Sequence, residues 1–179
     1  MRYLMVMVLA SFSGCHAVFG LEPDTEDAGA VPVCPSMYTP AASGTYWVGT
    51  DAKGWLDAQQ TCARHASPET GHTHLAVLEG AAALSEVADL VKAPTLWIGS
   101  SDLTIEGEFR WVTAQELAFP QLGSPVWALG QPDDAEGAED CVAVDLESSR
   151  LLYDRECFNP SAFLCECDSH PSVEANYGL

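Results

Sequence analysis

The chain has 179 residues, enough for one domain of ordinary size with short appendages, and 47% of the residues are hydrophobic, enough to fill a core. Seven basic residues stand against 26 acidic ones, which gives a formal net charge of −19. Binding to nucleic acid or to an anionic membrane surface relies on Lys and Arg, so the composition argues against both partners. It suits cations, or neutral ligands held through a cation.

The first 15 residues, MRYLMVMVLASFSGC, contain one arginine, an apolar run and small residues before Cys15. This pattern predicts a secretion signal that is too short to span a bilayer. Its end resembles a bacterial lipobox, although Phe12 stands where Leu is preferred, and Cys15 would then carry the lipid that anchors the protein at the outer membrane. Plain secretion is the alternative. Residues 16–33 lack apolar periodicity and are expected to form a flexible acidic tether.

From Cys34 onward the sequence alternates short apolar runs with two amphipathic stretches. The two stretches predict helices at 55–62 and 81–92, the second ended by Pro94. Strands are expected at 46–48, 74–78, 96–99, 109–112, 141–144, 151–153 and 162–166. This pattern predicts an α+β domain over residues 34–168, and a polar tail at 169–179 that we expect to be loose.

Carboxylates crowd the segment from Gln131 to Asp140, which also holds Pro132 and one side-chain amide. Crowded carboxylates repel one another unless they are solvated or share a cation. Calcium takes about six to eight oxygen ligands at roughly 2.3–2.6 Å, from carboxylates, amides and carbonyls. The segment is therefore a candidate cation site, with a solvated acidic loop as the alternative.

The chain contains seven cysteines, a number that indicates an oxidising compartment and a disulfide framework. The number is odd, and Cys15 differs from the other six in its surroundings. A zinc site built from Cys165, Cys167, His72 and His74 is the weaker alternative, because the spacing fits no common zinc finger.

In order and spacing, these elements resemble a C-type lectin-like domain from about residue 34 to residue 168. No single motif is decisive, but the ordered set is a strong signal. The features that carry the resemblance are Trp55…Ala58…Cys62, His74-Leu-Ala-Val-Leu78, Trp97-Ile-Gly99, Glu106-Gly107…Phe109…Trp111-Val112, Trp127…Gly130-Gln-Pro-Asp133, Glu139-Asp-Cys-Val142 and Phe163-Leu-Cys-Glu166.

The resemblance implies disulfides that tie the first helix to the last strand and brace the binding loop. Long-form members add a bridge within the first hairpin, but Thr45 stands where its second cysteine would be. Because the first and last strands pair in this fold, we predict that the remaining two cysteines of the domain bridge instead, which leaves Cys15 for lipid. The predicted pairs are Cys62–Cys165, Cys141–Cys157 and Cys34–Cys167.

The resemblance also implies two calcium sites, since the loop length is that of the mannose-binding proteins. An auxiliary site would use five side chains, and the matching positions here are all acids. They are Asp102, Glu106, Asp134, Glu139 and Asp140.

The principal calcium site of the family also touches the sugar, because two neighbouring sugar hydroxyls complete its coordination. The family's proline in this motif is cis, and Pro132 is expected to be so. A Gln-Pro-Asp sequence accompanies galactose-type sugars in the family. The matching positions, expected to bind both calcium and carbohydrate, are Gln131, Asp133, Glu139, Tyr153 and Asp154, with Tyr153 in place of the family's Asn.

Two departures favour an alternative within the same fold. Tyr153 has no amide oxygen to offer, and Asp134-Ala135 stand where strong galactose binders carry an aromatic residue. A calcium-stabilised adhesion or protein-binding module that has lost sugar recognition is therefore the rival hypothesis. An enzyme would need Asp133 and Glu139 to act as an acid–base pair on a glycosidic bond, but catalysis is rare in this fold, and none is expected.

Overall fold

The computed structural model describes residues 32–116 and 122–178. The predicted signal with Cys15, and the tether as far as residue 31, lie outside the described residues. The elements are β1 (Thr39–Pro40), β2 (Thr45–Lys53), α1 (Trp55–Ala63), β3 (His72–Leu75), α2 (Ala81–Leu90), β4 (Thr95–Ser101), β5 (Arg110–Trp111), η1 (Ala135–Gly137), β6 (Cys141–Asp145), β7 (Leu152–Arg155), β8 (Ser161–Asp168) and η2 (Glu174–Asn176). The predicted α+β class is confirmed.

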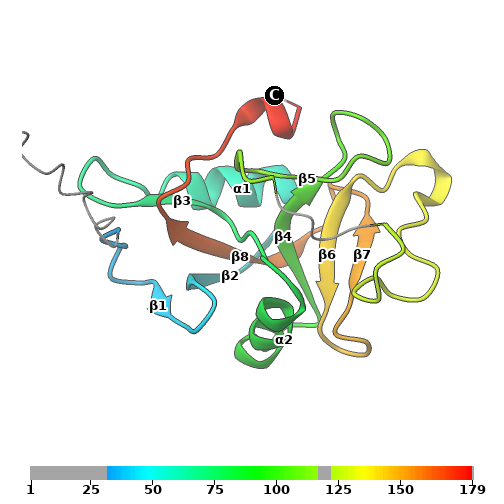
Figure 1. Cartoon of the computed structure of the whole chain (residues 1–179), viewed down its shortest axis with the longest axis horizontal. Helices are drawn as coiled ribbons and strands as arrows, with labels where there is room; N and C mark the ends of the chain where they lie inside the picture. Colours follow the sequence, from blue (N-terminus) through cyan, green and yellow to red (C-terminus); the bar gives the residue numbers. More distant parts are fainter. Residues whose placement is uncertain (1–31, 117–121, 179) are drawn as a thin grey trace, which may run out of the picture. The chain divides into compact units, whose positions relative to one another are not determined.

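Strand β8 organises the sheet, because it pairs with three other strands. The main path runs β1-β2-β8-β4-β6-β7, while β3 pairs with β8 and β5 pairs with β4. Only the β4–β8 pairing among the described strands is parallel, with Leu96 opposite Ala162. Figure 1 shows this long strand crossing between β2 and β4. The last strand therefore joins the beginning of the domain to its middle.

The two helices lie on opposite sides of the strands (Figure 1), and each buries the apolar face of its amphipathic sequence. In α1, Trp55, Ala58 and Cys62 are all fully buried. The Trp55 indole nitrogen donates to the Ile98 carbonyl at 2.7 Å, which fixes α1 to β4. In α2 the buried residues are Ala83, Leu84, Val87 and Ala88. Burying apolar side chains from both sides is what stabilises a small sheet of this kind.

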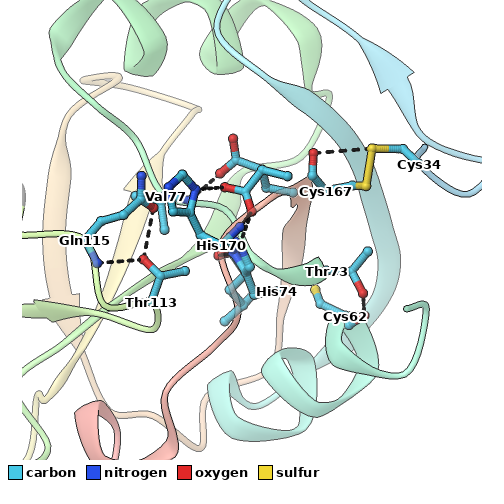
Figure 2. Close-up of polar contacts among 12 residues, drawn as sticks. Cys34, Cys62, Thr73, His74, Val77, Thr113, Gln115, Cys167 and His170 are labelled. Atoms are coloured by element: carbon cyan, nitrogen blue, oxygen red, sulfur yellow. Dashed lines mark hydrogen bonds and ion pairs between the residues drawn. A yellow bond between two sulfur atoms is a disulfide. The ribbon is translucent and has the colours of Figure 1, made fainter. Parts of the chain in front are cut away.

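Three disulfides join the described cysteines, and they are the three that the resemblance implied. They are Cys34–Cys167, Cys62–Cys165 and Cys141–Cys157. The first spans 133 residues and appears in Figure 2, with its sulfurs close to the end of β8. In the chain-entropy model, a bridge that closes a loop of this length lowers the entropy of the unfolded chain and so stabilises the fold by about 4–5 kcal/mol. With both of its sulfurs in disulfides, the zinc alternative is excluded.

The C-terminal segment, 169–178, is packed against the domain, so the prediction of a loose tail is wrong. The Asn176 side-chain amide donates to the Thr113 carbonyl at 2.6 Å. Tyr177 is only 5% exposed, and its ring lies edge-on to Trp55 at 6.0 Å. The polar composition concealed this, because one buried aromatic ring and a few backbone contacts are enough to hold a short segment.

Candidate metal centre

The loop between Trp127 and Cys141 presents its polar side chains to the end of β7. The Gln131–Pro132 peptide bond is cis, as the resemblance implied. The Gln131 side chain donates from Nε2 to Asp133 Oδ1 at 2.7 Å, and its Oε1 accepts from the Asp154 backbone N–H at 3.3 Å. Both side chains that flank the proline thus reach the same place.

Three carboxylates meet there. One oxygen each from Asp133, Glu139 and Asp154 lies within 4.8 Å of the others. Oxygens on opposite sides of a calcium ion are about twice its ligand distance apart, roughly 5 Å, so this spacing fits three ligands around one ion. Four of the five side chains predicted for the principal site therefore come together.

Asp154 anchors this group from the strand side. It is 2% exposed, and its two oxygens accept the backbone N–H groups of Asp133 at 3.2 Å and Asp134 at 2.8 Å. Burial raises the pKa of the Asp154 carboxyl, and the Asp133 charge raises it further, although the backbone donors oppose this. Burial likewise raises the pKa of Glu139, with further contributions from Asp154 and Asp133. Each acid makes its neighbours harder to ionise, and a shared cation would reverse that effect.

Tyr153 is the predicted residue that the structure does not bring to this group. Its hydroxyl lies 3.0 Å from Thr95 Oγ1. Successive side chains of a strand point to opposite faces, so a residue next to Asp154 on β7 faces away from the acids. The assignment of Tyr153 to the calcium and sugar ligands is therefore corrected.

A second acidic group lines an adjoining cavity of about 280 Å³. Asp102, Glu106 and Asp134 contribute to its wall, together with Asp133 and Asp154. Asp140 supplies its backbone carbonyl, which accepts the Asp102 N–H at 3.1 Å. Three of the five residues expected at the auxiliary site, Asp102, Glu106 and Asp134, thus share one cavity, whereas its described wall does not include the side chains of Glu139 or Asp140.

Asp102 is the most informative member of the second group. It is 2% exposed, and Oδ2 accepts the Gly107 N–H at 2.9 Å, whereas Oδ1 is buried with no partner in the described part of the chain. Burial raises the Asp102 pKa to about 7, and the charges of Glu106 and Asp140 add to the rise. A buried carboxylate oxygen without a partner is costly, and a cation bound at this position would satisfy it.

Sequence reasoning missed two features of these loops. Thr104 has a buried hydroxyl oxygen without a partner among the described residues, and no sequence motif marked it. Asp134 and Glu136 adopt left-handed backbone conformations, with φ of 41° and 63°. Aspartate tolerates this region better than most residues do, and Pro132 and Gly137 were the local sequence signs of a turn.

Residues 51–167 match the family model of the Lectin C-type domain, so this chain belongs to the C-type lectin family. Perlucin from Haliotis laevigata is 29% identical over 151 residues, which cover 80% of this chain and 90% of perlucin. The C-type lectin CEL-I from Cucumaria echinata superposes with a TM-score of 0.65 at 23% identity, covering 74% of this chain and 95% of CEL-I. The cow CD23 carbohydrate-recognition domain, solved in the presence of a GlcNAc2Man3 oligosaccharide, superposes with a TM-score of 0.63 at 26% identity. The match covers 76% of this chain and 97% of the CD23 chain.

These relatives are eukaryotic, so they give no support to a bacterial lipid anchor. Cys15 lies outside the described residues, and its lipidation remains a prediction. Within the described ranges, no helix has the length and apolar character needed to cross a membrane.

Proposed function

We propose that this domain binds calcium and uses it to hold a galactose-type sugar at Gln131, Asp133, Glu139 and Asp154. The observation that carries the proposal is the convergence of three carboxylates within 4.8 Å of one another at the end of β7. Asp133 and Glu139 lie on one loop and Asp154 lies on β7. Like charges at this spacing repel one another unless they share a cation. Carboxylate and amide oxygens are the ligands that calcium prefers.

The bound ion would supply coordination positions for two adjacent sugar hydroxyls. The protein's part is to fix the ligands and to hydrogen-bond the same hydroxyls. Gln131 can donate from its amide, whereas the Asp133 carboxylate can only accept. This order of donor and acceptor supports a galactose-type rather than a mannose-type sugar.

The second acidic group supports a structural calcium at Asp102, Glu106, Asp134, Glu139 and Asp140. Asp102 Oδ1 has no partner in the described protein, so it is free to bind an ion. Such an ion would connect the loop after β4 with the loop before β6. Its proposed role is to order these two loops, and it does not contact the sugar directly.

One observation favours the rival function, a calcium-stabilised module for adhesion or protein binding. With Tyr153 bonded to Thr95, the principal site lacks one of the family's side-chain ligands. The galactose and protein hypotheses both describe a binding domain and not an enzyme. Both also place it outside the cell, where three disulfides persist, either free or anchored through Cys15.

The test is isothermal titration calorimetry on the purified, oxidised protein, first with calcium and then with galactose. The proposal expects calcium uptake and galactose binding that a chelator abolishes, with mannose binding at least tenfold weaker. Glu139→Gln should abolish both, whereas Glu147→Gln, an exposed acid outside the site, should leave both unchanged. Calcium uptake without any galactose response would favour the protein-binding module, and absence of calcium uptake would rule out both.

A further inference from the structure

A cavity of about 380 Å³ lies on the other face of β7, away from the acids. Asp154 points into the metal centre, so its neighbour Arg155 points to the opposite face, together with Tyr153. The cavity is lined by Arg155 and Lys92, by the hydroxyl-bearing residues Thr50, Thr95 and Ser161, and by small apolar residues. Its size lies within the range typical of small-molecule sites.

Arg155 is held in place by three neighbours. Its Nη1 donates to Ser161 Oγ at 2.7 Å. Its guanidinium carbon lies 5.2 Å from the centre of the Trp97 ring and 5.8 Å from that of Tyr153. Contacts with aromatic faces at this distance are favourable for a guanidinium group and leave its other N–H groups available. The side chain is therefore ordered before any ligand arrives.

No carboxylate pairs with Arg155 among the described residues. Three other basic side chains do have such partners: Lys53 with Asp51, Arg110 with Glu108 and Arg150 with Asp89. Lys92, on the same cavity as Arg155, also has no acidic partner in the described ranges. Arg64 also lacks an acidic partner among the described residues, but it does not line this cavity. Arg155 and Lys92 therefore place two cations without acidic partners on one cavity, in a chain with seven basic and 26 acidic residues.

We propose that this cavity binds an acidic sugar through its oxyanion, independently of calcium. A guanidinium group matches a carboxylate or a sulfate with two parallel hydrogen bonds, and Lys92 adds a second positive charge. The hydroxyls of Thr50 and Thr95 are suited to the sugar's own hydroxyls. Tyr153 acquires a role here, since its ring contacts the arginine and its hydroxyl bonds Thr95.

The surrounding charge sets the strength of this site. A net charge of −19 repels anions at long range, so the attraction depends on the two nearby cations. Salt screens exposed charges separated by more than about 10 Å at 0.1 M and affects close contacts less. Binding is therefore expected in the millimolar range, and it does not rest on the metal centre.

The test is a nuclear magnetic resonance titration of the oxidised protein in the presence of a chelator. The probes are glucuronate, glucose 6-sulfate and glucose. We expect at least one acidic sugar to shift the backbone amide signals of residues 92, 93, 95, 153–155 and 161, with an affinity at least tenfold above that of glucose. The ranking of the two acids identifies the preferred oxyanion.

Arg155→Gln should weaken the affinity for the acidic sugar at least tenfold. Arg155→Lys should not keep the original affinity, because an ammonium group cannot form the paired hydrogen bonds. Arg110→Gln, at an arginine that already has an acidic partner, is the matched control and should change the affinity less than twofold. Lys92→Glu lies at an exposed position that tolerates substitution, and it should also weaken binding. Equal binding of glucose and glucuronate, or full affinity in Arg155→Gln or Lys92→Glu, would overturn the proposal.

Discussion

At the scale of single residues, the contacts of buried His74 favour its protonated form. It is fully buried, with Nδ1 at 2.9 Å from the Leu75 carbonyl and Nε2 at 3.1 Å from an Asp168 carboxylate oxygen. The Leu75 carbonyl can only accept, and so can the ionised Asp168 carboxylate, so these contacts favour a proton on both ring nitrogens. Figure 2 shows the His74 ring beside His170, whose Nδ1 lies 3.0 Å from the other Asp168 oxygen. Burial lowers the pKa of His74, but the hydrogen bond and charge of Asp168 outweigh burial and raise it.

This arrangement predicts stability that declines with rising pH. The folded-state pKa of His74 exceeds its unfolded value of about 6.5, so its contribution is complete below that pH and is lost as pH rises through the folded value. Glu166 acts in the same direction, because burial raises its pKa to about 7. The Asp168 pKa is lowered by His74 in spite of burial, so that contribution is lost only in acid. Urea unfolding at pH 5.5 and pH 8.5 measures the difference.

His74→Gln should lower the free energy of unfolding by about 1–3 kcal/mol at pH 5.5 and by distinctly less at pH 8.5. The reason is that the substitution removes a charged ring at pH 5.5 and a neutral one at pH 8.5. His72→Gln, an exposed histidine on the same strand, is the control and should change little at either pH. An equal loss at both values would show that His74 is neutral.

A second residue-scale prediction concerns Asp102. Asp102→Asn should raise the melting temperature of the metal-free protein at pH 8, because the substitution removes a buried charge that lacks a partner. The same change should reduce the stabilisation that calcium gives. Differential scanning calorimetry with chelator and then with calcium measures both effects. A lower melting temperature in the chelator would contradict the view that Asp102 is destabilising without a cation.

At the scale of elements, strand β7 serves two sites. Leu152 and Asp154 face inward and Tyr153 and Arg155 face the other way. One short strand therefore supplies a carboxylate to the candidate metal centre and a cation to the second cavity. The Cys141–Cys157 bridge ties the beginning of β6 to the residues just after β7. The candidate metal centre and the second cavity therefore share one strand, and a disulfide limits the movement of that strand.

The segment that contains η2 also gives an element-scale prediction. Tyr177→Ala should lower the free energy of unfolding by about 3 kcal/mol, as expected for truncating a buried aromatic side chain. Tyr177→Phe keeps the ring against Trp55 and serves as the control. Chemical denaturation followed by tryptophan fluorescence measures both. A change below about 0.5 kcal/mol in Tyr177→Ala would mean that the C-terminal segment does not stabilise the domain.

At the scale of the whole molecule, the net charge of −19 predicts that stability depends on cations. Millimolar calcium should raise the melting temperature by more than sodium chloride of equal ionic strength, because screening reduces repulsion everywhere whereas coordination acts at two places. Magnesium should give a smaller rise, since it requires shorter, octahedral ligand distances. Equal shifts with all three salts would show that only the general repulsion was relieved.

Much of this architecture could be predicted from the sequence, because apolar spacing, cysteine positions and the Gln131-Pro132-Asp133 motif are local signals. The spacing placed Trp55, Ala58 and Cys62 on one buried face. The direction of Tyr153 was not predictable, since it follows from the register of β7 and from a distant hydroxyl on Thr95. The second cavity was not predicted for the same reason: Lys92 and Arg155 are far apart in sequence and line one cavity only in the folded domain.

The Cys34–Cys167 bridge has a mechanical consequence. Its two Cα atoms are 5.8 Å apart, and it joins the first described loop to the last strand of the sheet. A pulling force applied ahead of Cys34 would be transmitted directly to β8, which is hydrogen-bonded to three other strands. The weak two-residue strand β1 would carry none of that tension until the sulfurs were reduced.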